Sequence, residues 1–333
     1  MIAKYSTVGV MSDQALLVIT RYWIVPSEGA PTRLDAFVRR CLPHLSRREV
    51  ENAIRDKLFR IHKSAGGKGD KLLAGDRVTF EGPGHWLLTS PVPQSQLRVP
   101  IVFEDASVLV VDKPAGMATH GFSGRDAATL TNFLTAQRPE LLNIGKSRWE
   151  PGLVHRLDRE TSGLVLVAKT QDAFDHLRLQ FRRRQVKKKY WAFVWGIAPA
   201  EGTVSYPIAH DFRDKKRMRA LVDNSPGLKN QKSWRALTRF RKLYDADALS
   251  LLEIEMETGV THQIRVHLAA VGHPIVGDIL YGDIGRERFG LKRHFLHACC
   301  LEFLHPREHR TVTVKSELPA ELDNVLRRLL SQL

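Results

Sequence analysis

The sequence predicts an α+β protein, in which a mixed, largely antiparallel β-sheet domain with peripheral helices follows a small N-terminal module of helices and a hairpin. Its 333 residues are enough for one large core and one smaller one. Apolar residues such as Leu252, Ile254 and Met256 alternate with glutamates, as they do in a half-buried strand. Because such strands do not alternate regularly with helices, a doubly wound parallel sheet is not expected.

The N-terminal module is predicted to open with two short helices. Apolar residues recur at helical spacing between Leu34 and Cys41, and Pro43 ends that helix. The sequence from Ser46 to Glu49 has the capping-box pattern that begins a second helix, and a small hairpin follows it. The predicted divisions are an N-terminal extension at residues 1–30, the module at 31–85, a proline-rich linker at 86–100 and the main domain at 101–333.

The charge balance points to a polyanionic partner. The chain has 51 Lys and Arg residues against 36 Asp and Glu, which gives a net charge of +15 and a pI near 9.9. This excess favours nucleic acid over an acidic membrane surface or a merely solvated surface. The longest apolar run near the N-terminus, residues 15–19, is too short to span a membrane, and no targeting segment is recognised.

Cysteines and histidines argue against a disulfide or metal framework. Cys41, Cys299 and Cys300 lack C-x-x-C spacing, so neither disulfides nor zinc are expected, and a reducing cytoplasm is favoured. The three histidines within residues 262–273 have spacings that fit no common pair of helical metal ligands. The sequence therefore predicts a cytoplasmic protein without a metal site.

Residues 152–166, GLVHRLDRETSGLVL, enclose a polar segment between two apolar, β-prone ends. Polar groups so close to a core cost free energy unless they are paired or exposed for a purpose. Asp158 in this segment is a candidate nucleophile or general base. A more ordinary role is open as well, since a loop aspartate can cap a turn or pair with a neighbour such as Arg156 or Arg159.

A second polar segment follows a predicted strand that ends at Thr258 and Gly259. A helix is expected to begin near Thr261, and the spacing places Thr261, His262 and Arg265 on one face of it. An exposed polar helix face is the alternative interpretation.

A third segment is strongly basic. Residues 177–196 contain seven positive charges within 178–189, at the end of a predicted helix, and then Tyr190 and Trp191 on a strand. Positive charge followed by aromatic side chains is typical of nucleic-acid grooves, where phosphates pair and bases stack. A solvated helix end is the alternative. Residues 214–219 repeat the basic pattern on a predicted loop.

These segments resemble the motifs of a known family. HRLDRETSGLVLVAKT, residues 155–170, is similar to the signature of the RluA-like pseudouridine synthases. Four further segments resemble motifs of that family in family order: DKPAG (112–116), KKYWA (188–192), THQIRVHLAAVGHPIVGDILYG (261–282), and LHA (296–298) with FLHP (303–306). Residues 33–80 resemble, more weakly, the RNA-binding module named after small-subunit ribosomal protein S-four.

The resemblance implies that the chain isomerises uridine to pseudouridine in structured RNA without a cofactor or metal. It favours large-subunit ribosomal RNA over transfer RNA as the substrate. It also implies that Asp158 is the catalytic carboxylate, that Tyr190 packs against the target base and that Arg265 pairs with Asp158. Both covalent attack of Asp158 on the sugar and removal of a sugar proton stay open. Val260 departs from the family pattern, which usually has arginine there.

Two sets of residues are expected around this chemistry. The active-site support is expected from His155, Arg156, Leu157, Thr161, Ser162, Gly163, Thr261, His262 and Leu296. RNA contacts are expected from Arg47, Arg48, Arg182, Arg183, Arg184, Lys187, Lys188, Lys189, Lys215, Lys216 and Arg217. A monomer is the expected state. The competing functions are an RNA-binding protein without catalysis, which would have lost Asp158, Tyr190 or Arg265, and a metal-dependent nuclease, which needs clustered acidic ligands.

Overall fold

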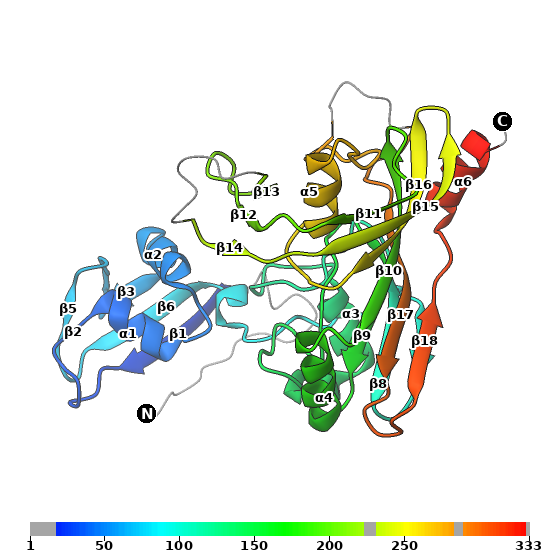
Figure 1. The fold of residues 1–333 in the computed structure, drawn as a ribbon. Helices are drawn as coiled ribbons and strands as arrows, with labels where there is room; N and C mark the ends of the chain where they lie inside the picture. The colour runs from blue at the N-terminus through cyan, green and yellow to red at the C-terminus, as the bar shows by residue number, and fades with distance from the viewer. Residues whose placement is uncertain (1–17, 223–230, 283–288, 331–333) are drawn as a thin grey trace. The chain divides into compact units, whose positions relative to one another are not determined.

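A computed structural model of the protein describes residues 18–222, 231–282 and 289–330. The chain divides into two compact units (Figure 1). The small unit comprises Met1–Pro93 and Gly121–Ala127, and the large unit comprises Gln94–His120 and Ala128–Leu333. Each unit has a hydrophobic core of its own.

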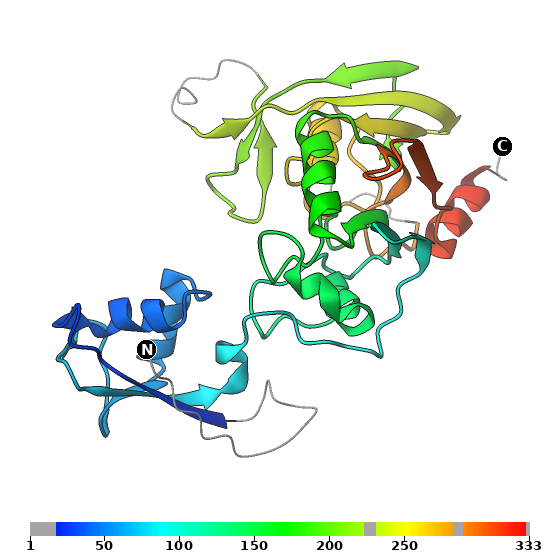
Figure 2. The same cartoon turned by 90° about the horizontal axis from the view of Figure 1, so that it is seen from below.

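The small unit is a short sheet with two helices on one of its faces (Figures 1 and 2). Its helices are α1 (Leu34–Cys41), α2 (Arg47–Arg55) and the 3-10 helix η1 (Gly84–Leu87). Its strands are β1 (Val18–Ile24), β2 (Thr32–Arg33), β3 (Phe59–Ile61), β4 (Ser64–Ala65), β5 (Lys71–Leu72) and β6 (Arg77–Pro83). The strand order is β1-β6-β3-β4, and β2 pairs with β5.

Both predicted helices of the module are present. The Ser46 hydroxyl accepts a hydrogen bond from the Glu49 N–H, and the Glu49 carboxylate accepts one from the Ser46 N–H. This reciprocal pair is the predicted capping box, and it satisfies two donors that a helix N-terminus leaves without intrahelical partners. The apolar positions of α1 are buried in the core of the small unit, as their spacing predicts.

The limits of the module differ from the predicted ones. β1 pairs antiparallel with β6 along its whole length, so part of the predicted extension at 1–30 is a strand of the small sheet. Residues 1–17 of that extension lie outside the described residues. Trp86, at the start of the predicted linker, is buried in the small core, with the Arg125 guanidinium 4.8 Å from its ring centroid. The partners that hold these segments are distant in the sequence, which is why local patterns do not reveal them.

The large unit is built around a nine-stranded sheet. Its helices are α3 (Leu130–Gln137), η2 (Pro139–Asn143), α4 (Gln171–Arg182), α5 (Gln263–Ala270) and α6 (Ala320–Leu330). Its strands are β7 (Ile101–Glu104), β8 (Val108–Lys113), β9 (Ser162–Ala168), β10 (Lys187–Trp195), β11 (Glu201–Val204), β12 (Ile208–His210), β13 (Met218–Ala220), β14 (Ser233–Trp234), β15 (Thr238–Ala246), β16 (Leu249–Met256), β17 (Leu296–Leu304) and β18 (Thr311–Lys315).

The large sheet is mixed and largely antiparallel, as the sequence predicts. Its order is β11-β15-β16-β10-β17-β9-β8-β7, and β18 pairs with β17. Within the described residues β9 and β17 form the parallel pair of this sheet, and the other pairs are antiparallel. β12, β13 and β14 form a separate three-stranded sheet.

Both faces of the large sheet are covered, which explains the continuous apolar run of β9. Val165 and Val167 pack in one core together with residues of α3, α5 and α6. Leu164 and Leu166 pack in another core together with residues of α4. A strand that is buried on both faces carries apolar residues at every position instead of alternating ones. The polar segment that precedes β9 therefore begins at the edge of a dry core.

The described residues show neither a membrane-spanning helix nor a cluster of metal ligands. Among the described residues, no helix combines the length and the apolar composition needed to cross a membrane. Over the same part of the chain, no group of three or more His, Cys, Asp or Glu side chains is arranged to hold a metal ion. Cys41, Cys299 and Cys300 are free thiols.

Candidate active site

The loop that carries Asp158 is fixed through its backbone by side chains from elsewhere in the large unit. The Thr119 hydroxyl donates to the Leu157 carbonyl at 2.7 Å and accepts from the Leu157 N–H at 3.1 Å. Lys113 is fully buried and donates to the carbonyls of Arg159, Pro114 and Met117. Burial lowers the pKa of Lys113 to about 7, and the three carbonyls satisfy its ammonium donors. The loop is thereby held in one geometry.

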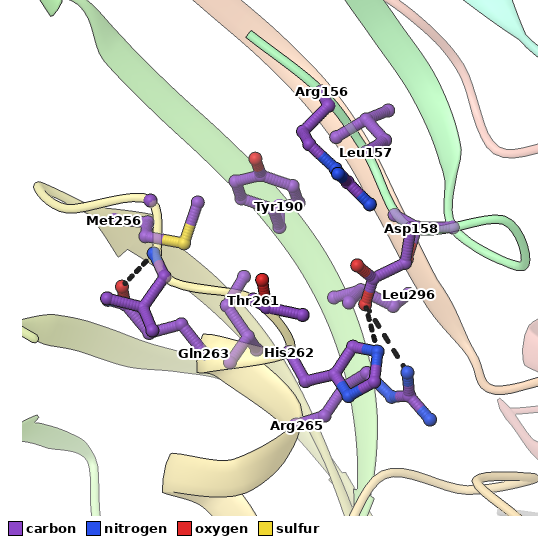
Figure 3. A pocket seen from close by; sticks show the side chains of 14 residues that line it. Arg156, Leu157, Asp158, Tyr190, Met256, Thr261, His262, Gln263, Arg265 and Leu296 are labelled. Carbon is purple, nitrogen blue, oxygen red and sulfur yellow. Dashed lines mark hydrogen bonds and ion pairs between the residues drawn. The ribbon is translucent and has the colours of Figure 1, made fainter. Parts of the chain in front are cut away.

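The carboxylate of Asp158 faces a cation that comes from α5. Arg265 Nη1 lies 3.3 Å from Asp158 Oδ2 (Figure 3). The same guanidinium donates to both oxygens of Asp278, from Nε at 2.7 Å and from Nη2 at 2.9 Å. Burial opposes the charge of Arg265, but the bonds to Asp278 outweigh it and raise its pKa. Arg265 therefore stays charged and is aimed at Asp158, whose side chain is 21% exposed.

His262 is the second group beside this carboxylate. Its Nε2 lies 3.9 Å from Asp158 Oδ2, and its Nδ1 lies 2.8 Å from the Tyr281 hydroxyl. Mainly because of burial, the pKa of His262 is lowered, so the ring is neutral at pH 7. His262 has a left-handed backbone, with φ of 57°, at the residue before α5. Such a backbone costs free energy in a residue other than glycine and is frequent at functional sites.

A pocket opens beside Asp158, with Tyr190 from β10 as one wall (Figure 3). Tyr190 is 3% exposed, and burial together with the nearby Asp158 charge raises the pKa of its hydroxyl. Apolar contact surface comes from Leu157, Met256 and Leu296. The pocket is lined by Arg156, Leu157, Asp158, Thr161, Tyr190, Met256, Gly259, Val260, Thr261, His262, Gln263, Ile264, Arg265 and Leu296. A flat, partly apolar ring could therefore pack against Tyr190 and the apolar side chains of the pocket, next to the Asp158–Arg265 pair.

Three of the predicted supporting residues lie outside this pocket. His155 stacks on Phe181 and accepts a hydrogen bond from the Leu166 N–H, and burial lowers its pKa to about 3. Ser162 lies 2.9 Å from His297 Nδ1 and is buried. A Cβ on Gly163 would lie 2.3 Å from the Ala298 carbonyl oxygen, so only glycine allows β9 to approach β17 there. These three residues therefore do not line the pocket; their contacts hold the Asp158 loop and the start of β9 in place.

The basic residues of the third segment divide into two groups. Arg182 ends α4, and Arg183 and Arg184 follow it, all exposed. The prediction that Lys187, Lys188 and Lys189 continue a helix was wrong, because all three lie on β10. Lys187 pairs with Glu302 at 2.7 Å and Lys189 with Glu253 at 3.2 Å.

Lys188 is buried, in contrast to its neighbours. Its Nζ donates to the Thr258 carbonyl at 3.3 Å and lies 5.7 Å from the Phe181 ring centroid. Burial lowers its pKa to about 8. Lys188 is therefore unavailable as a surface contact to RNA. The other predicted RNA contacts, Arg47, Arg48, Lys215, Lys216 and Arg217, are exposed.

Sequence reasoning missed several residues that hold the site together. Asp278 orients Arg265, Tyr281 contacts His262, and Thr119 clamps the loop. Asp278 and Tyr281 lie within the quoted motif at 261–282, but neither residue was singled out there. The motif could have drawn attention to Asp278 and Tyr281. Their partners could not be predicted, because those contacts form only in the folded chain.

The sequence is similar to known RNA pseudouridine synthases. The sequence matches the RNA pseudouridylate synthase family over residues 107–270. It is 38% identical, over 93% of each chain, to an uncharacterised RNA pseudouridine synthase of Chloroflexus aurantiacus. The chain belongs to the RluA-like family of pseudouridine synthases. This pseudouridine synthase is also 35% identical to ribosomal large subunit pseudouridine synthase D of Neisseria meningitidis, over 91% of this chain and 80% of that protein.

A solved structure of the family has the same fold. The human RNA pseudouridylate synthase domain containing 1 is 29% identical to this pseudouridine synthase and matches 72% of its chain and 96% of the human one, with a TM-score of 0.54. The predicted mixed, largely antiparallel sheet of the synthase is thereby confirmed. The part that matches the family, residues 107–270, contains Asp158, Tyr190 and Arg265.

Proposed function

We propose that this RNA pseudouridine synthase isomerises specific uridines of large-subunit ribosomal RNA and uses Asp158 as its catalytic carboxylate. The observation that carries this proposal is the position of Asp158, 3.3 Å from a guanidinium that Asp278 holds in place. Either chemical route uses the carboxylate oxygen as nucleophile or base, and the guanidinium places a positive charge beside that oxygen. The isomerisation moves the glycosidic bond from N1 to C5 of uracil without net oxidation, so the proposal needs no cofactor.

Two routes are compatible with an ionised Asp158. In the first, a carboxylate oxygen bonds to the anomeric carbon while the bond to N1 breaks, and uracil takes the electron pair. In the second, the carboxylate removes the 2′ proton while uracil leaves, which gives a glycal. In the first route, C5 then bonds to the anomeric carbon and displaces the carboxylate. In the second, C5 bonds to the anomeric carbon of the glycal while Asp158 returns the proton to C2′. In both routes C5 loses its proton and N1 gains one, so Asp158 ends as a free carboxylate.

Tyr190 is proposed to hold the detached uracil in the pocket, so that the base is not lost before C5 bonds to the sugar and water does not attack the anomeric carbon. Its buried ring and the apolar side chains of Leu157 and Leu296 supply a surface for the base. A pocket that keeps water away protects a reactive intermediate. The target nucleotide has to leave its stack to reach Asp158, as in other enzymes that act on a base.

The RNA substrate class is proposed from the relatives and from charge. The relative from Neisseria meningitidis is named a ribosomal large subunit pseudouridine synthase, and the net charge of +15 suits a large polyanion. We propose that the small unit, with its exposed Arg47 and Arg48 on α2, is an RNA-binding module of the ribosomal-protein S-four type. Comparing pseudouridine maps of total RNA from cells with and without the gene would identify the modified nucleotides; sites only in transfer RNA would contradict this choice.

The central test is Asp158→Asn, which keeps the shape of the side chain and removes its charge. With RNA that carries tritium at C5 of uridine, pseudouridine formation releases the tritium, because C5 becomes the glycosidic carbon. We expect release to fall by about 10⁴-fold or more, the size of loss seen when a catalytic nucleophile is removed. The affinity for RNA should stay close to that of the wild type.

Glu160→Gln is the matched control, since it removes a negative charge from the same loop outside the pocket. It should leave tritium release within a few-fold of the wild type. Substantial release by Asp158→Asn would overturn the role of Asp158. Loss of activity in a chelator, with recovery on adding a divalent cation, would overturn the proposal that no metal takes part.

A further inference from the structure

The hairpin of β12 and β13 presents a basic loop with a defined backbone. Residues 211–219 contain five cations and two aspartates. The aspartates fix the loop: Asp211 accepts from the N–H groups of Arg213 and Asp214, and Asp214 accepts from the Lys216 N–H. Because the carboxylates of both aspartates accept hydrogen bonds from the backbone, they stabilise the turns of the loop. The basic side chains therefore extend from an ordered loop.

Phe212 in this loop is the exception to its polar surroundings. Its side chain is 68% exposed, although the loop is ordered by hydrogen bonds on both sides of it. The guanidiniums of Arg213 and Arg219 lie 5.1 and 5.0 Å from its ring centroid. Cations at this distance are attracted to the ring and hold it in place. An exposed aromatic ring next to cations combines the two groups that bind single-stranded nucleic acid.

The hairpin is joined to the catalytic pocket by direct contacts. Met218 of β13 is buried with Val266 of α5 in a small hydrophobic cluster, and Figure 1 shows these elements side by side. The Met218 N–H donates to the Tyr281 hydroxyl at 2.8 Å, and that hydroxyl contacts His262. The position of the hairpin is therefore fixed relative to the helix that lines the pocket.

We propose that Phe212 is a stacking platform for an unpaired base of the substrate RNA, close to the nucleotide that enters the pocket. The cations at Arg213, Lys215, Lys216 and Arg217 bind the flanking phosphates. RNA is preferred over a protein partner because the excess of positive charge around the ring complements a phosphate backbone on both sides of a stacked base. This inference rests on the proposed function and adds a binding site for a base that is not the one modified.

The test measures binding of a fluorescent oligouridine and of its duplex with oligoadenosine to the full-length protein. Phe212→Ala should weaken binding of the single strand by about 5- to 100-fold, the loss expected for one stacked base. It should leave binding of the duplex nearly unchanged, because paired bases cannot stack on a side chain. Phe212→Trp should restore binding, and Ile197→Ala, which removes another exposed apolar side chain, should have no effect.

The salt dependence separates stacking from charge. Phe212→Ala should keep the wild-type slope, whereas Lys215→Ala with Lys216→Ala should lower it by about one unit or less for each lost phosphate contact. Unchanged binding of the single strand, or an equal loss for strand and duplex, would overturn the proposal. If wild-type protein formed no pseudouridine in any RNA, the proposed function would fail, while the difference between strand and duplex would still report on Phe212.

Discussion

At the scale of single residues, the site depends on one charge placed between two carboxylates. Arg265 makes a two-pronged contact with Asp278, whose side chain is fully buried, and extends its remaining nitrogen to Asp158. A bidentate pair of this kind fixes the plane of the guanidinium as well as its charge. Burial opposes the ionised carboxylate, but the bonds to Arg265 outweigh it, so the pKa of Asp278 is lowered.

Replacing Asp278 tests this arrangement. Asp278→Asn keeps the shape of the side chain but leaves the Arg265 charge buried without its main partner. We expect the free energy of unfolding to fall by about 3–5 kcal/mol, the usual cost of breaking a buried ion pair. Urea unfolding at pH 7 measures this loss.

An exposed pair on α6 provides the control for that measurement. Arg327 pairs with Asp323 one helical turn away, and its side chain is 78% exposed. Arg327→Ala should change the free energy of unfolding by about 0.5 kcal/mol or less. If both substitutions lowered the free energy of unfolding equally, the contact between Asp278 and Arg265 would contribute no more than an exposed ion pair.

At the scale of elements, β10 decides which of the clustered cations can meet RNA. Burial alternates along its first residues, with Lys187 and Lys189 outward and Lys188 and Tyr190 inward. The outward lysines are occupied by glutamates on the neighbouring strands β16 and β17. The lysines of β10 are therefore paired within the sheet, and the exposed arginines at the end of α4 are the more accessible charges.

The salt dependence of RNA binding separates these two groups. Arg182→Ala with Arg183→Ala should lower the slope of affinity against salt concentration by about 1 to 2 units, since each lost phosphate contact removes slightly less than one unit. Lys187→Ala with Lys189→Ala should lower it by about half a unit or less, because these lysines already pair with glutamates. Fluorescence anisotropy with ribosomal RNA fragments gives both slopes. A larger fall for the lysine pair would contradict the assignment.

At the scale of the whole molecule, buried histidines link stability to pH. Burial lowers the pKa of both His155 and His294 to about 3, well below the ordinary value for histidine. His155 accepts from the Leu166 N–H, and His294 contacts Thr161, so both neutral rings have polar partners. In the unfolded chain the same rings take up a proton as the pH falls through about 6.5.

Acid should therefore destabilise the large unit well before its carboxylates titrate. The contribution of each ring is fully present above about pH 6.5 and is lost as the pH falls towards 3, at up to about 1.4 kcal/mol per pH unit. Urea unfolding between about pH 7 and pH 5 should show this fall. His155→Gln should be less stable at pH 7 yet show a flatter pH dependence; an unchanged slope would refute the role of His155.

Much of the local structure could be predicted from sequence patterns, whereas long-range pairing could not. The capping box from Ser46 to Glu49 predicts the start of α2, because both partners lie within one helical turn. The N-terminal extension carries no clear local signal and could have been a strand or a frayed arm; its residues 18–24 form β1, because β6, about 60 residues later in the chain, pairs with them. The lysines at 187–189 were assigned to a helix, because a run of charge without interleaved apolar residues has no period to distinguish helix from strand.

The class of fold, the family resemblance and the candidates Asp158, Tyr190 and Arg265 could all be predicted from the linear chain. Those follow from residue types at fixed spacing. The resemblance also implied that Arg265 pairs with Asp158, although local patterns allowed a turn cap or a pair with a neighbouring arginine as well. The folded chain places Asp158 against Arg265 and brings in Asp278, which orients that guanidinium. The partner of a carboxylate depends on distance and burial in the folded chain. Asp158 and Arg265 are 107 positions apart in the sequence, so they become neighbours only when the sheet is assembled.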